Sequence, residues 1–313
     1  QTLDVTNSKT LSDGLKFQPG LRVENNCQNC GTTQVRINGM EGSYSQILID
    51  SRPMIGALAG VYGLEQIPAN MIERIEVVRG GGSALFGANA IGGTINIITR
   101  EPIRNSGEFS HTLSSINGTG SLENNTTFNA SLVNDTRNAG IMVYGQHRIR
   151  DEFDIDGDGF TELPSLKNRS LGFRSFLKTG VYSKLTIEYR NIHEFRRGGD
   201  RLDLQPFESY ITEQVEHYIN SGSLSFDKYS TDQKSKLNLY AAASHTHRGS
   251  YYGAGDPFSK NVPAIEQGMS QNEIDNINEI IENNQTRINS FGTTSELTYQ
   301  IGGHYIRSFS NLW

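Results

Sequence analysis

Residues 67–100 read IPANMIERIEVVRGGGSALFGANAIGGTINIITR, and this stretch decides the fold of the first third of the chain. Two runs rich in β-branched residues, 71–78 and 93–99, flank a glycine-rich turn, and this pattern predicts two β-strands. Further elements are expected upstream, namely a short helix at 11–17 and strands at 34–38 and 45–50. Glu101-Pro102 ends the region because proline cannot continue a central strand. The sequence therefore predicts a small α+β domain over residues 1–103.

The same stretch resembles the plug domain of TonB-dependent outer-membrane receptors. The similar motifs are IP at 67–68, IERIEV at 72–77, RG at 79–80, SALFG at 83–87, and AIGG at 90–93 followed by INIIT at 95–99. Upstream, VRING at 35–39 and QILID at 46–50 also resemble family motifs, with departures from the usual pattern at Asn38 and at Ser51-Arg52. The resemblance spans about residues 10–101.

This resemblance implies a plug that fills a 22-stranded barrel, active import of a ligand, and energy delivered through the partner protein TonB. It also implies that Arg36 and Arg79 pair with carboxylates of the barrel wall, as plug arginines of the family do. A buried charge needs such a partner. The role of these pairs is structural rather than catalytic, and no constellation in the sequence suggests an enzyme.

Long alternating segments follow from residue 108 onward. Nine strands are predicted, at 108–116, 122–133, 139–150, 167–178, 183–197, 214–227, 234–248, 290–301 and 304–313. The segment 184–196 alternates polar and apolar side chains, which gives a strand one face of each kind. Short connections alternate with long ones, as in outer-membrane barrels with short periplasmic turns and long external loops. Residues 104–313 are therefore predicted to form the N-terminal part of a transmembrane antiparallel β-barrel. An odd number of strands suggests that the barrel continues beyond the chain.

Composition narrows the class of protein. The chain has 313 residues, a net charge of −6 and only 35% hydrophobic residues. No stretch reaches the roughly 18 consecutive apolar residues of a membrane-spanning helix, which excludes a helical membrane protein. The mild acidity argues against a nucleic-acid partner. The first residues show no signal peptide. We expect the protein to lie in a lipid bilayer, namely the outer membrane of a Gram-negative bacterium.

The only cysteines, Cys27 and Cys30, have C-x-x-C spacing. This spacing fits a redox pair, half of a zinc site or a small disulfide. Zinc needs two further ligands nearby, and none of the seven histidines lies within 80 residues. Because the surrounding residues predict a loop and the compartment is oxidising, a structural disulfide is the favoured interpretation.

An acidic loop follows the third predicted barrel strand. Asp154, Asp156 and Asp158 occupy positions 1, 3 and 5 of an EF-like loop, with glycine at position 6. Asp151 and Glu162 are available to complete the oxygen shell, although position 12 is a serine. The loop is a candidate calcium site, and a solvated acidic turn is the alternative. Cobalamin receptors of the family have an aspartate-rich calcium site in the corresponding loop.

The predicted ligand is a scarce metal chelate. Cobalamin is the first hypothesis because of the acidic loop, and haem is the alternative. Plug loops at 25–33 and 52–62 are expected to face outward, so that Asn29, Arg52 and Tyr62 contact the ligand. An acidic helix over 264–283 either covers the external mouth or meets a surface lipoprotein. Two other classes are considered and disfavoured. A plug would block a passive porin-like barrel, and the strands are too long for a soluble calcium-binding β-domain.

Overall fold

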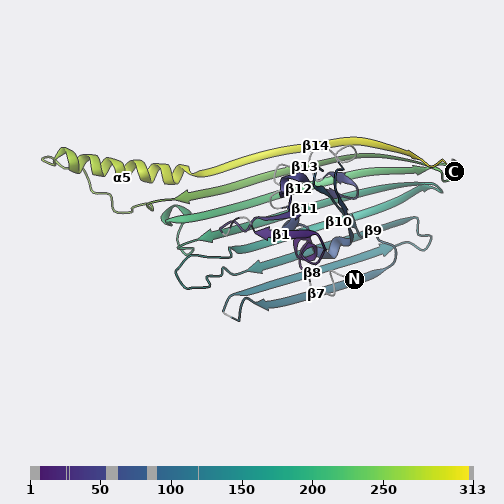
Figure 1. The fold of residues 1–313 in the computed structure, drawn as a ribbon, viewed down its shortest axis with the longest axis horizontal. Coiled ribbons are helices and arrows are strands. Elements are labelled where there is room, and N and C mark those ends of the chain that lie inside the picture. The colour runs from purple at the N-terminus through teal and green to yellow at the C-terminus, as the bar shows by residue number, and fades with distance from the viewer. Residues whose placement is uncertain are drawn as a thin grey trace.

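The computed structural model describes residues 8–25, 27, 29–53, 63–82, 90–118 and 120–309. The chain forms a small N-terminal domain and a sheet of eight long strands, and the domain lies against one face of this sheet (Figure 1). Among the described residues, no helix is both long and apolar enough to cross a membrane. The predicted boundary between residues 103 and 104 lies in the connection between the last strand of the domain and the first strand of the sheet.

The N-terminal domain is built on a four-stranded sheet with the order β4-β3-β6-β5 and a separate hairpin. Its elements are α2 (Leu11–Leu15), β1 (Leu21–Asn25), β2 (Thr33–Ile37), η1 (Gly42–Tyr44), β3 (Ser45–Ile49), β4 (Arg52–Pro53), α3 (Gly63–Gln66), η2 (Ala69–Met71), β5 (Ile72–Arg79) and β6 (Gly93–Thr99). The two strands predicted around the glycine-rich turn are confirmed as β5 and β6. Leu11, Ile37, Leu64, Ile67 and Ile95 belong to a fully buried apolar core that joins the helices to the sheet.

Two positions that depart from the family motifs are turn residues. Asn38 and Gly39 have φ values of 52° and 82° and reverse the chain between Ile37 and Met40. Asparagine and glycine are the residues that tolerate such left-handed conformations in a two-residue turn. Asp50 and Ser51 likewise have positive φ values, of 49° and 65°, between β3 and β4. The departures therefore lie at tight turns, where backbone conformation restricts the side chain.

The second part is an antiparallel sheet in which each strand pairs with its sequence neighbours, from β7 to β14. The strands are β7 (Ser106–Ser115), β8 (Leu122–Val133), β9 (Ala139–Arg150), β10 (Ser165–Gly180), β11 (Ser183–Gly199), β12 (Ile211–Tyr229), β13 (Ser235–Ala254) and β14 (Phe291–Arg307). Among the described residues this sheet has eight strands rather than the predicted nine. The predicted strand 290–301 and the first residues of the predicted strand 304–313 form one strand, β14, and the turn expected at Gly302-Gly303 is wrong. Residues 310–313 lie outside the described residues.

The glycine pair in β14 serves packing rather than chain reversal. Gly302 lies opposite Tyr240 in the neighbouring strand. A Cβ atom on Gly302 would lie 2.5 Å from the Tyr240 hydroxyl oxygen, so the glycine leaves room for the ring. Both glycines keep extended backbone and continue the ladder, because glycine permits a turn but does not require one.

Polar and apolar side chains alternate along the long strands, as predicted. The face toward the N-terminal domain carries buried polar residues, among them Asn125, Gln146, Arg148, Glu194 and Arg196. The opposite face carries exposed apolar residues, among them Leu132, Leu171, Ile187, Leu239 and Leu297. This reversal of the usual burial pattern is typical of strands whose outer face meets lipid.

Long and short connections alternate as expected. The short turns are 134–138, 181–182 and 230–234, and the long loops are 151–164, 200–210 and 255–290. The last of these loops contains α5 (Gln271–Asn289), which extends beyond the strands at the end of the sheet opposite the C-terminus (Figure 1). The helix begins with a capping box, in which Ser270 and Glu273 bond each other's backbone amides. The predicted acidic helix is confirmed, with bounds shifted toward the C-terminus.

Candidate functional site

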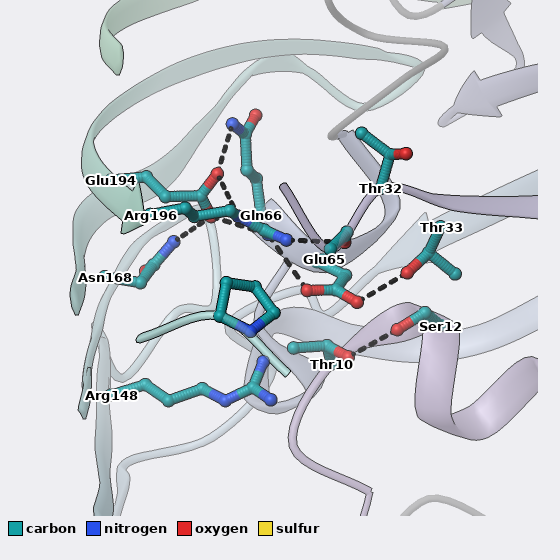
Figure 2. Close-up of polar contacts among 12 residues, drawn as sticks. Thr10, Ser12, Thr32, Thr33, Glu65, Gln66, Arg148, Asn168, Glu194 and Arg196 are labelled. Carbon is teal, nitrogen blue, oxygen red and sulfur yellow. Dashed lines mark hydrogen bonds and ion pairs between the residues drawn. The ribbon is translucent and has the colours of Figure 1, made fainter. Parts of the chain in front are cut away.

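Buried ion pairs join the N-terminal domain to the inner face of the sheet, and the largest group centres on Arg196 of β11 (Figure 2). Its Nη2 atom lies 2.9 Å from Glu65 Oε2 of α3, and its Nε atom lies 3.0 Å from Glu194 Oε1. The Arg196 and Glu194 side chains are each only 1% exposed. Gln66 of the domain and Asn168 of β10 donate to the Glu194 carboxylate, at 3.2 and 2.9 Å. One guanidinium therefore holds a carboxylate from each side of the contact.

A second group centres on Arg174 of β10. Its Nη1 atom lies 2.5 Å from Asp50 Oδ2, and its Nη2 atom lies 3.3 Å from Glu101 Oε1. Glu188 of β11, directly opposite Arg174 in the register, also pairs with it. Asp50 in turn accepts hydrogen bonds from the backbone amide and hydroxyl of Thr99. Arg174 thus ties the β3–β4 turn of the domain to the sheet.

A third group has the opposite polarity. Lys9 of the N-terminal domain places its Nζ atom 3.0 Å from Glu123 Oε2 of β8. The other oxygen of Glu123 lies 2.5 Å from Arg148 Nε of β9. Glu123 and Arg148 are both buried. Together the three groups place charged contacts on β8, β9, β10 and β11, so they fix the domain across half of the sheet.

The predicted pairing of Arg36 and Arg79 with wall carboxylates is wrong. Arg36 bonds Glu24 of the same hairpin, with 2.5 Å between Nε and Oε2. Its neighbours Val35 and Ile37 are buried, so alternation along β2 turns Arg36 away from the core. Arg79, at the exposed end of β5, donates to the carbonyl oxygen of Pro19. Both arginines find acceptors within their own domain.

Of the three predicted ligand-contacting residues, the two that the structure describes, Asn29 and Arg52, do not come together. The backbone of Asn29 packs against β11, because a Cβ atom on Gly198 would lie 2.3 Å from the Asn29 carbonyl oxygen. Arg52 donates to Ser223 of β12 and lies over the Tyr240 ring, where it lines a cavity of about 130 Å³ between domain and sheet. Tyr62 lies outside the described residues.

The expectation that Arg52 faces the external end is therefore wrong. Asn29 lies between Cys27 and Cys30 in the sequence, and Cys27 contacts Glu213 at the end of β12 that follows the long loop 200–210. The contact of Arg52 with Ser223 lies ten residues further along the same strand, a distance of about 33 Å at ~3.3 Å per residue. A ligand contact by Asn29 stays a prediction.

The predicted disulfide between Cys27 and Cys30 is also wrong for this structure, because both thiols are free. Each has another partner. The Cys27 Sγ atom donates to Glu213 Oε2 at 3.1 Å and accepts from the Cys30 amide at 3.3 Å, and the Cys30 thiol donates to Thr32 at 3.7 Å. Burial and the adjacent Cys30 and Glu213 raise the pKa of Cys27 to about 12, so the thiol keeps its proton at neutral pH.

The acidic loop brings together three of its five predicted calcium ligands. Carboxylate oxygens of Asp154, Asp156 and Glu162 all lie within 4.8 Å of one another. Asp158 is not in this group, and its Oδ1 atom accepts from the backbone amide of Phe160. Asp151 turns away to accept from the backbone amide of Leu122 in β8. The predicted five-residue set is therefore corrected to three.

The backbone already supports this loop. The amides of Gly159 and Gly157 donate to the Asp154 carboxylate at 2.8 and 2.7 Å. These hydrogen bonds lower the pKa of Asp154 below its usual value, so the group is ionised at neutral pH. Glu162 accepts from the amide of Ile155 at 2.7 Å. The loop thus holds the three carboxylates on one side of a tight turn.

Residues 1–94 match the family model described as the TonB-dependent Receptor Plug Domain. This range contains β3, β4 and β5 of the four-stranded sheet and the first two residues of β6. The N-terminal domain is a TonB-dependent receptor plug. The ion pairs described above therefore join a plug to the inner face of a barrel portion.

Two curated relatives and one solved structure support the assignment. The chain is 37% identical over 99 residues to the vitamin B12 transporter BtuB of Vibrio vulnificus, which is 32% of this chain and 16% of the relative. It is 34% identical over 172 residues to the iron-regulated outer membrane virulence protein of Vibrio cholerae, which is 51% of this chain and 26% of the relative. The fold resembles the siderophore receptor PirA from Acinetobacter baumannii with a TM-score of 0.70 and 19% identity, over 97% of this chain and 44% of PirA.

The match to PirA extends through the plug and the eight strands, so the sheet is a portion of a β-barrel. The chain spans about a sixth to a quarter of the length of the curated relatives it matches. The Vibrio vulnificus relative is a transporter and PirA is a receptor, so neither of these two is an enzyme.

The contact between plug and barrel wall is expected to weaken in acid. Burial by itself raises the pKa of Glu65, but Arg196 and Arg148 outweigh it and hold the pKa below the usual value. A carboxyl group whose pKa is lowered by folding stabilises the folded state at pH values above its unfolded pKa of about 4.3. This contribution is lost as the pH falls through the pKa of the folded state. The unfolding free energy of the full-length protein should therefore fall below about pH 4.3. Denaturant unfolding at several pH values measures this.

The matched control is Glu73, an exposed carboxylate of β5 that pairs with Arg74. Replacing Glu65 with glutamine should flatten the acid-dependent part of the stability profile, and Glu73→Gln should leave the profile as in the parent protein. Equal acid dependence in the parent and in Glu65→Gln would assign the effect to other carboxylates.

Proposed function

We propose that the chain is the N-terminal part of an outer-membrane receptor that imports a scarce metal chelate, with energy delivered through TonB. The observation that carries this proposal is a plug held by buried ion pairs against strands whose outer face is apolar. Such a plug closes the lumen and has to rearrange before a ligand passes, which requires work. The chain belongs to the outer membrane of a Gram-negative bacterium, and its role is transport rather than catalysis.

Our first candidate ligand is cobalamin, and haem is the alternative. The relative with 37% identity over the plug is a vitamin B12 transporter, which supports cobalamin. The acidic loop is a second argument for cobalamin. It lies at the long-loop end of the wall, and cobalamin receptors of the family have an aspartate-rich calcium site in the corresponding loop. A passive pore is disfavoured because the ion pairs at β8 to β11 hold the plug in place. A surface lipoprotein that contacts α5 stays a further part of the proposal.

Ligand identity is tested with the full-length protein in detergent. Cyanocobalamin, haemin and a ferric catecholate are added separately, and the absorbance that co-elutes with the protein is recorded. Co-elution of cyanocobalamin alone supports the first candidate, and co-elution of haemin or the ferric chelate alone overturns it. Uptake of the bound ligand by cells, with and without a collapsed inner-membrane proton gradient, then separates active import from passive diffusion.

Calcium is expected to bind at Asp154, Asp156 and Glu162 and to strengthen ligand binding. Without a cation, three carboxylates within 4.8 Å repel one another. Calcium accepts six to eight oxygens and would fix the loop before the ligand arrives, which removes part of the ordering cost. We expect a gain in ligand affinity of about tenfold, which corresponds to about 1.4 kcal/mol. Calorimetry with calcium, and ligand titrations with calcium or chelator, measure both effects.

Replacing Asp154 and Asp156 with asparagine should abolish calcium binding and the calcium dependence of ligand affinity. The control is Glu152→Gln, which removes one charge from the same loop. Glu152 is exposed and stands outside the three-carboxylate group. If chelator leaves ligand affinity unchanged in the parent protein, the calcium proposal fails and cobalamin loses its support from the loop.

A further inference from the structure

Three potential metal ligands meet where the plug touches β12. The Sγ atoms of Cys27 and Cys30 and a carboxylate oxygen of Glu213 all lie within 4.8 Å of one another. The closest contact is 3.1 Å, between Cys27 Sγ and Glu213 Oε2. Cys30 is 5% exposed, and the other two residues are half-buried. The third ligand lies 186 residues after Cys27 in the sequence, so only the fold brings the set together.

The local backbone presents both sulfur atoms to the same point. The amide of Gly31 donates to the Cys27 carbonyl oxygen at 2.9 Å, and the amide of Cys30 donates to Cys27 Sγ at 3.3 Å. Gly31 has a φ of 62°, a conformation that glycine adopts without strain. A tight turn with an amide pointing at sulfur lowers the cost of placing negative charge there. Spacing of C-x-x-C is also that of paired thiolates in zinc sites.

Two thiolates and a carboxylate carry three negative charges, so a divalent cation reduces the net charge of the cluster to minus one. The Arg196 guanidinium, which pairs with Glu65 and Glu194, also donates to the Gly31 carbonyl oxygen at 2.8 Å and so holds the loop in place. The side-chain oxygen of Asn29, between the two cysteines in sequence, is buried and has no hydrogen-bond partner among the residues that the structure describes. A disulfide would leave the Glu213 carboxylate without the thiol that now donates to it.

Sulfur decides the class of cation. Thiolates select zinc and similar soft or borderline metals, whereas calcium and magnesium need a shell of oxygen atoms. In a tetrahedral zinc site with bonds of about 2.3 Å to sulfur and 2.0 Å to oxygen, ligand atoms are roughly 3.5 Å apart. The three ligand atoms therefore need to move by only about 1 Å. Three protein ligands leave a fourth position for water.

We propose that Cys27, Cys30 and Glu213 form a zinc site that links the plug to the barrel wall. Binding releases the two thiol protons and replaces the contact between Cys27 and Glu213 by bonds to the metal. Because two ligands come from the plug and one from β12, the metal is a bridge across the contact. Zinc should therefore bind tightly only while the plug is seated.

The test uses the full-length protein in detergent, purified under reducing and metal-free conditions. We expect one equivalent of zinc by elemental analysis and competition against a chromophoric chelator. Cobalt should give the intense sulfur-to-metal absorption of thiolate coordination. Glu213→Gln should weaken zinc affinity by at least about tenfold, and Cys30→Ser should abolish the cobalt absorption.

The control is Glu216→Gln, on the same strand, where the carboxylate contacts His193 Nε2 at 2.7 Å instead of the thiols. This variant should bind zinc like the parent. If Cys30→Ser fails to fold, the comparison of Glu213→Gln with Glu216→Gln still decides the case. Reduced parent protein that binds no zinc, or Glu213→Gln protein that binds zinc with parental affinity, overturns the proposal. The proposal is also overturned if protein from the native envelope contains a Cys27–Cys30 disulfide and binds no zinc after that disulfide is reduced.

Discussion

Replacing Arg196 with methionine is expected to cost about 3–5 kcal/mol of stability at the contact between plug and barrel. The substitution keeps much of the side-chain volume but leaves Glu65 and Glu194 without their shared cation. Glu194 is fully buried, so no water replaces the lost partner. Hydrogen exchange of the plug amides and denaturant unfolding of the full-length protein both report the loss. The plug should exchange faster, while the outer strands of the barrel keep their protection.

Two variants separate the loss of a buried pair from general damage. Arg22→Met removes an arginine that is 79% exposed and bonds Glu24 at 2.7 Å, and an exposed pair contributes at most about 1 kcal/mol. The triple variant Glu65→Gln, Glu194→Gln and Arg196→Met removes the uncompensated charges and should recover part of the loss. If Arg196→Met is no less stable than Arg22→Met, the group at Arg196 does not hold the plug.

Gly93→Ala is expected to destabilise the plug by about 2–4 kcal/mol through overpacking and backbone strain. Gly93 begins β6, pairs with Arg79 of β5 and has a φ of 153°. A Cβ atom there would lie 2.5 Å from the backbone oxygen of Val78, which cannot rotate away. Loss of hydrogen-exchange protection in β5 and β6 measures the effect.

The matched control is Gly81→Ala, in the glycine-rich segment that follows β5. A Cβ atom on Gly81 meets no other described atom within 4 Å, so the change should stay within about 0.5 kcal/mol. Equal protection of β5 and β6 in the Gly93→Ala and parent proteins would mean that the sheet adjusts its register without cost.

The sequence was sufficient for the elements because their signals are local. Strands β5 and β6 were predicted from β-branched runs, and the barrel strands were predicted from period-two alternation. Alternation also placed Glu188, Glu194 and Arg196 on one polar face, which the structure confirms as the inner one. The Gly302-Gly303 error has a different cause. A glycine pair signals a turn locally, and only the Tyr240 ring across the ladder explains its place within β14.

The partners of the charges could not be predicted from the sequence. Arg36 and Arg79 have acceptors in their own domain, whereas Arg174 meets Asp50, which lies 124 residues away. Which arginine is buried depends on how the plug sits against the wall, and no local pattern encodes that. The same holds for Glu213, whose distance in sequence from the cysteines concealed a third ligand. A useful signal was present in the inward polar positions of the long strands, since buried charges there require partners.

The part of the inner wall formed by β9, β10 and β11 carries an excess of positive charge that the plug partly offsets. Its inward cationic residues are Arg148, Arg150, Arg174, Lys178, Lys184, Arg190 and Arg196, and its inward acidic residues are Glu188 and Glu194. Asp50, Glu65 and Glu101 offset part of this excess from the plug side. Any displacement of the plug removes these carboxylates and uncovers a basic lining. The exposed cationic side chains would then attract anionic solutes. The plug carboxylates would compete with such a solute for the same cationic groups and would pair with the wall again once the solute has passed.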